Sequence, residues 1–215
     1  MKIKISIFVF LLMSFLNMGA ISNLQMTGSP FYNFEITAAN KSEFEENGIK
    51  LQYRTKEEIK KESLRIKECL NNDIAGDYRV IGKDQVEILN DDFNINIKLW
   101  NEDEYTYIEI ILINKNSQYT TFDLKNILEK IQNQNSESAQ YFLYYKGKIE
   151  ECYNNQIIHE LANENNIKKM YVLDINNGCI GTGYLSNGEK INFALSNYDT
   201  GSYIIIGTPI IFATY

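Results

Sequence analysis

Residues 94–113 read NINIKLWNEDEYTYIEIILI and contain the clearest strand pattern in the chain. Ile95 and Ile97 alternate with polar neighbours, so a strand here would bury one face and expose the other. The turn-forming residues 101–103 separate this run from a second β-prone run, Tyr105 to Ile113. Two such runs joined by a short polar loop predict an antiparallel hairpin.

Four more strand-like segments lie upstream of this hairpin. The runs Tyr78 to Ile81 and Gln85 to Leu89 are separated by Gly82-Lys83-Asp84, so they extend the hairpin into an antiparallel meander. Further upstream, residues 31–37 (FYNFEIT) are aromatic and β-prone, and residues 49–54 (IKLQYR) alternate apolar and polar side chains. Both segments are predicted to be strands or extended chain.

Two amphipathic helices flank the meander. Apolar residues recur at helical spacing from Lys56 to Leu70 and again from Phe122 to Ile131. Polar capping residues open both helices: Thr55 with Glu58 for the first, and Thr120 with Asp123 for the second.

The order of elements begins again after the polar junction at residues 132–138. The sequence LYYKGK at 143–148 echoes LQYRTK at 51–56, and each precedes a predicted helix. Asn187-Gly188 is a strong hairpin signal. The predicted elements of this second part are a strand at 140–145, a helix at 155–163, and strands at 169–175, 179–185, 191–195 and 203–206.

This pattern predicts the fold class α+β, with a duplicated, helix-backed antiparallel sheet. The first half would span residues 31–135 and the second half residues 138–215. Two helix-backed sheets can join edge to edge into one curved sheet with the helices on one face.

The N-terminal segment predicts an exported protein. Lys2 and Lys4 precede an apolar run, Ile5 to Leu16, and small residues follow. This arrangement is typical of a secretory signal peptide, with cleavage after Ser22, or after Ala20 as the alternative. Residues 1–22 would then be absent from the mature protein.

The apolar run of about 12 residues is shorter than the roughly 20 that a membrane-spanning helix needs. An uncleaved membrane anchor over residues 5–21 is the alternative to a signal peptide. In both cases the N-terminal segment engages the membrane during export, and the protein is expected outside the cytoplasm, secreted or in the cell envelope. ATP, NAD(P)H and chromosomal DNA are not routine partners there.

The composition is that of an ordinary globular protein with an acidic balance. The chain has 215 residues, 44% of them hydrophobic and 23% charged, and a formal net charge of −7. Cleavage after Ser22 would remove two lysines and no acid, which leaves 19 basic against 28 acidic residues and a net charge of −9. Nucleic-acid affinity comes largely from Lys and Arg that neutralise phosphates, so no nucleic-acid partner is expected.

No arrangement for catalysis, cofactor binding or metal binding is apparent. His159, the single histidine, lies in HELAN, where Asn163 takes the place of the second histidine of a zinc-protease motif. We therefore expect a surface histidine, no metal and no cofactor. Cys69, Cys152 and Cys179 lack zinc spacing and are expected to be small buried hydrophobes, with one disulfide possible. Paired carboxylates fall mostly in loops and at helix starts.

Tyrosine is abundant, with fifteen residues in the chain. The tyrosines cluster in predicted strands, where core packing and β-propensity account for many of them. A sheet face that no helix covers must stay polar or find a partner, and outward tyrosines on it would form a contact surface. Tyr107 and Tyr145 are the candidate contact residues.

The element order, the export signal and the terminal run GTPIIFATY (residues 207–215) resemble the YwmB-like family of Gram-positive bacteria. The most specific part is residues 206–211 (IGTPII) together with Tyr215; a relative would more often carry an acidic residue before that tyrosine. The resemblance implies a saddle-like sheet similar to that of the TATA-box-binding protein. It implies no catalytic residues, because the family is functionally uncharacterised.

The sequence thus predicts an exported, non-enzymatic binding module of the bacterial cell envelope. Its partner would be an envelope protein or a wall polymer that the sequence does not identify. The alternatives are an extracytoplasmic enzyme that uses carboxylates and, against the charge balance, a DNA-binding protein.

Overall fold

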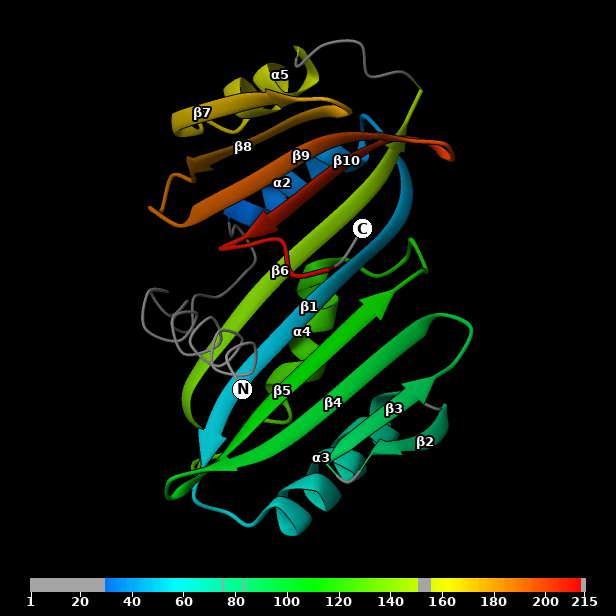
Figure 1. Cartoon of the computed structure of the whole chain (residues 1–215), viewed down its shortest axis with the longest axis vertical. Helices are drawn as coiled ribbons and strands as arrows, with labels where there is room; N and C mark the ends of the chain where they lie inside the picture. Colours follow the sequence, from blue (N-terminus) through cyan, green and yellow to red (C-terminus); the bar gives the residue numbers. More distant parts are fainter. Residues whose placement is uncertain (1–29, 75, 83, 151–155, 214–215) are drawn as a thin grey trace.

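The structure is a computed structural model that describes residues 30–74, 76–82, 84–150 and 156–213. Within these residues, ten strands form one antiparallel sheet and four helices lie against one of its faces (Figure 1). The predicted α+β class is confirmed. No helix of this described part is long and apolar enough to cross a membrane. The predicted export segment, residues 1–22, lies outside it.

The bounds of the elements agree with most of the predicted segments. The helices are α2 (Pro30–Ala39), α3 (Ile59–Asp73), α4 (Thr121–Glu129) and α5 (Gln156–Glu164). The strands are β1 (Glu43–Thr55), β2 (Asp77–Gly82), β3 (Gln85–Leu89), β4 (Phe93–Glu102), β5 (Tyr105–Asn114), β6 (Glu137–Ile149), β7 (Lys168–Ile175), β8 (Gly178–Tyr184), β9 (Lys190–Tyr198) and β10 (Gly201–Thr208).

The strand order is symmetric about the centre of the sheet. The order is β2-β3-β4-β5-β1-β6-β10-β9-β8-β7, so β1 and β6 pair in the middle and the two meanders extend outward from them. Each part of the chain runs helix, strand, helix and then four strands. The two central strands have 13 residues each and pair antiparallel over nearly their whole length.

The helices interlock the two parts of the chain. Helix α2 precedes β1 in the sequence, but it contacts β6, β10 and α5, which belong to the later part. Helix α4, which precedes β6, contacts β1 as well as β6. Because each of these helices packs partly on strands of the other half, the sheet is held together by more than the β1–β6 ladder.

Side chains on the strands alternate between two faces. On β1, Ile49, Leu51 and Tyr53 are fully buried against the helices, in the main hydrophobic cluster. Burial of each such side chain stabilises the fold by about 1.5 to 3 kcal/mol. Lys50 and Gln52 point to the opposite side of the sheet, which we call the open face.

The prediction of a strand over residues 31–37 was wrong, because this segment forms α2. Phe31, Phe34 and Ala38 recur at helical spacing and are all buried, and Pro30 occupies the first helical position, where it is tolerated. The aromatic residues have high β-propensity, but packing of one helical face against the sheet overrides it.

One of the two predicted helix caps is present. At the start of α4, the Thr120 side chain accepts from the Asp123 amide and the Asp123 side chain accepts from the Thr120 amide, which is a capping box. The box predicted for Thr55 and Glu58 was wrong. Helix α3 begins after Glu58, whose side chain caps nothing, because β1 runs on through Thr55.

Candidate functional site

The C-terminal segment, residues 209–213, crosses the open face after β10, and we call it the strap (Figure 1). Asn192 Nδ2 on β9 donates to the carbonyl oxygen of Pro209 at 2.5 Å. The ring of Phe212 packs on that of Tyr144, with centroids 5.7 Å apart. A Cβ at Gly207 would lie 2.9 Å from the Ile210 oxygen, so the turn into the strap requires glycine. The strap therefore covers the middle of the open face.

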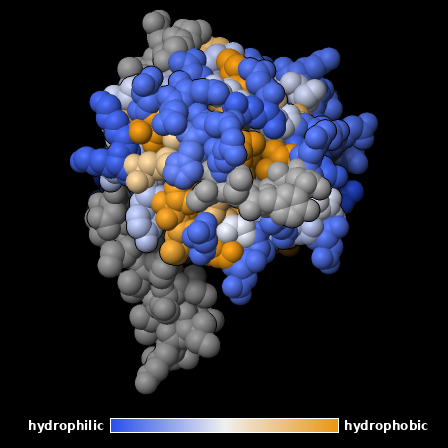
Figure 2. Space-filling model, turned by 90° about the horizontal axis from the view of Figure 1, so that it is seen from above, coloured by the Kyte–Doolittle hydropathy of each residue, from blue (hydrophilic) through white to orange (hydrophobic). Residues whose placement is uncertain are grey.

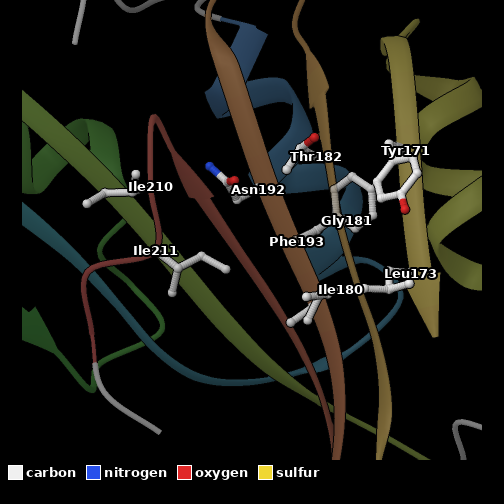
Figure 3. A pocket seen from close by; sticks show the side chains of 10 residues that line it. Tyr171, Leu173, Ile180, Gly181, Thr182, Asn192, Phe193, Ile210 and Ile211 are labelled. Atoms are coloured by element: carbon white, nitrogen blue, oxygen red, sulfur yellow. The ribbon is translucent and has the colours of Figure 1, made fainter. Parts of the chain in front are cut away.

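Between the strap and the edge strand β7 lies a groove of about 370 Å³. In Figure 3, Tyr171 and Leu173 of β7 stand on one side of it, and Ile210 and Ile211 of the strap stand on the other. Strands β8 and β9 form its floor. The floor residues are Ile180, Gly181, Thr182, Asn192, Phe193 and Ala194.

The strand register explains why these residues meet. Tyr171 pairs with Thr182, which in turn pairs with Asn192, so these three side chains form one row across the open face. In the next row, Leu173, Ile180 and Ala194 are aligned in the same way. Residues directly opposite each other in an antiparallel ladder share a face, so the groove has one mixed polar-aromatic row and one apolar row.

The groove exposes large apolar side chains to solvent. Tyr171 is 64% exposed, Leu173 48% and Ile180 43%. None of the ten lining residues is an acid, a lysine, an arginine or a histidine. Figure 2, which views the β7 and α5 end of the molecule, shows apolar side chains gathered between polar ones. A cleft that combines exposed apolar walls with a few polar groups has the chemistry of a binding site.

Tyr107, a predicted contact residue, lies on the open face but outside the groove. Its ring is half-buried and stacks on Trp100 with centroids 5.6 Å apart and an interplanar angle of 15°. The neighbouring Arg54 lies over the Tyr105 ring at 4.3 Å. Tyr107 therefore belongs to an aromatic patch on β4 and β5, at a distance of several strands from β7.

Tyr145, the second predicted contact residue, is not on the open face, and this prediction was wrong. Tyr145 is 1% exposed, packs in the main core and shares a hydrogen bond with the Ser42 hydroxyl at 3.0 Å. Burial raises the pKa of its phenol. Tyr145 in LYYKGK occupies the position of Tyr53 in LQYRTK, and Tyr53 is also buried. Because side chains alternate between the two faces of a strand, both rings lie on the helix side of the sheet.

Two buried acids lie on the helix side of the sheet. Glu35 of α2 accepts hydrogen bonds from Asn47 Nδ2 at 3.0 Å and from the Thr121 amide at 3.1 Å. Burial raises the pKa of Glu35 more than these hydrogen bonds lower it. Glu62 of α3 accepts a 2.5 Å hydrogen bond from Tyr53. Neither acid lines the groove, and their partners show that they join helices to the sheet.

The other predicted chemical residues occupy ordinary positions. His159 is exposed on α5, as predicted for a surface histidine. Cys179 is buried, Cys69 is half-buried with a free thiol, and Cys152 lies outside the described residues. Within the described residues, no group of three or more His, Cys, Asp or Glu side chains could hold a metal ion.

Comparison with known proteins adds little. No family model matches the chain, and no curated protein does. Among solved structures, the crystal structure of DynU16, a protein of the dynemicin biosynthetic locus, aligns with 75% of this chain and 86% of its own at 6% identity and a TM-score of 0.26. A likeness this weak carries no argument about fold or function. The resemblance to the YwmB-like family stays a prediction.

Sequence reasoning missed the groove itself. The strand that became β7 was predicted, but in the run MYVLDI (residues 170–175) both alternating sets contain apolar residues, so the pattern could not select Tyr171 and Leu173 as the outward pair. The strap was visible only as the terminal run of the family resemblance. Its path back over the sheet depends on tertiary contacts with Tyr144 and Asn192.

Proposed function

We propose that the protein is an exported, non-enzymatic binding module of the bacterial cell envelope, and that the groove between β7 and the strap is its contact site. The observation that carries this proposal is the exposure of Tyr171, Leu173 and Ile180 along one groove. Contiguous apolar surface rimmed by polar groups is costly to leave in water and is typical of interaction sites.

The lining favours a protein partner over a charged wall polymer. The groove offers aromatic and aliphatic side chains with the two polar groups of Thr182 and Asn192, and it contains no charged side chain for a polyanion. The acidic balance of the whole chain also disfavours polyanions such as nucleic acids. Tyr107 and its aromatic patch remain a second, predicted contact area on the same face.

We further propose that the chain belongs to the YwmB-like family and that its sheet has the saddle form of the TATA-box-binding protein. The symmetric strand order about β1 and β6 supports this proposal. The strap supplies one wall of the groove, and it belongs to the same terminal run that carries the family resemblance.

The alternative of an enzyme that uses carboxylates has no acid at the groove to support it. Glu35 and Glu62 instead have structural partners on the helix side. A binding module therefore accounts better for the described surface.

The test is site-specific photo-crosslinking in living cells of the native host. Position 171 is replaced by p-benzoylphenylalanine in the full-length protein, and the matched control carries the same group at Val80, which is 70% exposed on the opposite edge strand β2. We expect a discrete higher-mass adduct from position 171 and none from position 80. Equal adducts from both positions, or none from position 171, would refute the groove as the contact site.

A further inference from the structure

A cationic row lies directly beyond the polar row of the groove. Lys168 on β7 pairs with Tyr184 on β8, and Tyr184 pairs with Lys190 on β9, so all three side chains share the open face. All three are exposed. The ammonium of Lys169 lies 5.8 Å from the Tyr184 ring centroid, so a third lysine lies beside this row.

These lysines have no acidic partner within the described residues. In the part of the chain that the structure describes, no ion pair involves Lys168, Lys169 or Lys190, and Glu189, which is adjacent to Lys190 in the sequence, forms none with it. The chain as a whole has a net charge of −7, yet this end of the apolar groove gathers three lysines that form no ion pair within the described residues. They attract a negative group on a ligand.

The polarity changes in steps along the strands. The cationic row around Tyr184 comes first, then the row of Tyr171, Thr182 and Asn192, and then the apolar row of Leu173, Ile180 and Ala194. A ligand that matches this order is elongated, with carboxylates or another anion at one end and apolar groups beyond.

The groove also borders an edge strand. β7 ends the sheet, so one side of its backbone has no partner strand among the described residues. A bulge between Lys168 and Tyr171, with Lys169 at a φ of 50°, disrupts the start of this edge, whereas residues 171–175 pair regularly with β8. The bulge is therefore confined to the cationic end, and the wall of the groove at residues 171–175 is a regular strand.

From these features we infer that the occupant of the groove is an extended peptide segment of a partner protein, with acidic residues that lie by Lys168 and Lys190 and alternating apolar residues that lie against Leu173. The segment lies along the groove, over β8 and β9 and between β7 and the strap. The inference rests on the proposed function, since it names the ligand class of the same groove. An acyl chain with an anionic head has the same polarity, but walls as exposed as Tyr171 and Leu173 would leave it largely in water.

The test begins with selection of binders from a random twelve-residue peptide library on the full chain, followed by fluorescence anisotropy of the enriched peptides. We expect peptides with acidic residues at one end and alternating apolar residues beyond. The double variant Lys168→Glu with Lys190→Glu should weaken their binding about tenfold, as expected for two lost charge pairs. Leu173→Asp should abolish binding, whereas Val80→Asp on β2 should change nothing.

Photo-crosslinking of an enriched peptide tests where it lies. With p-benzoylphenylalanine at position 171 we expect an adduct with the peptide, and with the same group at Val80 we expect none. Enrichment of peptides without acidic residues, or equal adducts from both positions, would overturn the inference.

A failed selection can be separated from a failure of the proposed function by flotation with vesicles of phosphatidylglycerol. If no peptide binds but vesicle binding is lost on Leu173→Asp, the peptide inference is overturned and the groove remains the contact site. If Leu173→Asp affects neither peptide binding, vesicle binding nor the photo-adduct from position 171, the proposed function fails as well.

Discussion

The buried carboxylate of Glu35 joins the two parts of this chain, so replacement of Glu35 tests how strongly they are joined. Its carboxylate extends from α2, which contacts β6 and β10, to the first turn of α4, where it accepts from the amide and hydroxyl of Thr121. It also accepts from Asn47 on β1. Glu35 is 3% exposed and Thr121 is fully buried, so no solvent can replace a lost partner.

The replacement Glu35→Ala leaves two buried donors of Thr121 without an acceptor, whereas Asn47 keeps the Tyr119 carbonyl oxygen at 2.8 Å. Each orphaned donor costs about 1 to 2 kcal/mol, and removal of a desolvated carboxylate offsets part of that. We expect a net loss of about 2 kcal/mol in the free energy of unfolding. Glu35→Gln should lose less, because its amide oxygen can still accept from the Thr121 amide.

The pH dependence of the free energy of unfolding separates the cost of burying the Glu35 carboxylate from the stabilisation by its hydrogen bonds. Burial raises the pKa of folded Glu35 above its ordinary 4.5, so between these two values the folded state holds more protons than the unfolded state. Glu35 therefore makes the protein less stable as pH rises from about 4.5 through its folded pKa, and Glu35→Gln removes this slope. Urea titrations at a series of pH values, followed by circular dichroism, measure it, with the exposed Glu45→Gln as the control.

If Glu35→Gln and the wild-type protein show the same slope, the burial argument is wrong. If Glu35→Ala is as stable as Glu45→Gln, the carboxylate does not join the helices.

Two further predictions concern the strap and the tyrosines. Gly207→Val should destabilise the protein by about 1 to 3 kcal/mol in urea titrations, because its side chain would collide with the strap at Ile210; an unchanged midpoint would contradict the strap path. Tyr145→Ala should cost about 3 to 5 kcal/mol in thermal unfolding, and the half-buried Tyr107→Ala distinctly less; equal losses would contradict the assigned faces.

Strand and helix order could be predicted because the patterns in this chain are regular. In β4, Ile95, Ile97 and Leu99 alternate with polar residues and are all buried in the structure. A period of two with one polar face leaves little choice of structure or orientation. The same regularity allowed β1 and β6 to be recognised as repeats of one element.

Prediction failed where apolar residues occur on both faces. Tyr144 and Tyr145 are adjacent on β6 and both are 1% exposed, since the helices cover one and the strap packs on the other. No periodicity can assign an outward residue in such a run, and the correct assignment needed the position of the strap. The groove could likewise not be predicted from the sequence, because its two walls lie far apart in the chain.

The strap also covers tyrosines that the open face was expected to expose. A sheet face without helices was expected to expose its tyrosines, yet Tyr144 and Tyr203 lie in a second apolar cluster together with Phe212. The exposed apolar side chains that line the groove, Tyr171, Leu173 and Ile180, lie on the β7 side of the strap. Partner binding is then expected at a defined groove and not across the whole sheet.

The most direct test of the central claim, a binding module that acts outside the cytoplasm, is mass spectrometry of the protein recovered from fractionated cells of its native host. The mature N-terminus and the compartment are read together. The account predicts an N-terminus at Asn23 in the envelope or medium fraction, or an intact Met1 in the membrane fraction for the anchored form. An intact Met1 in the cytosol would contradict it.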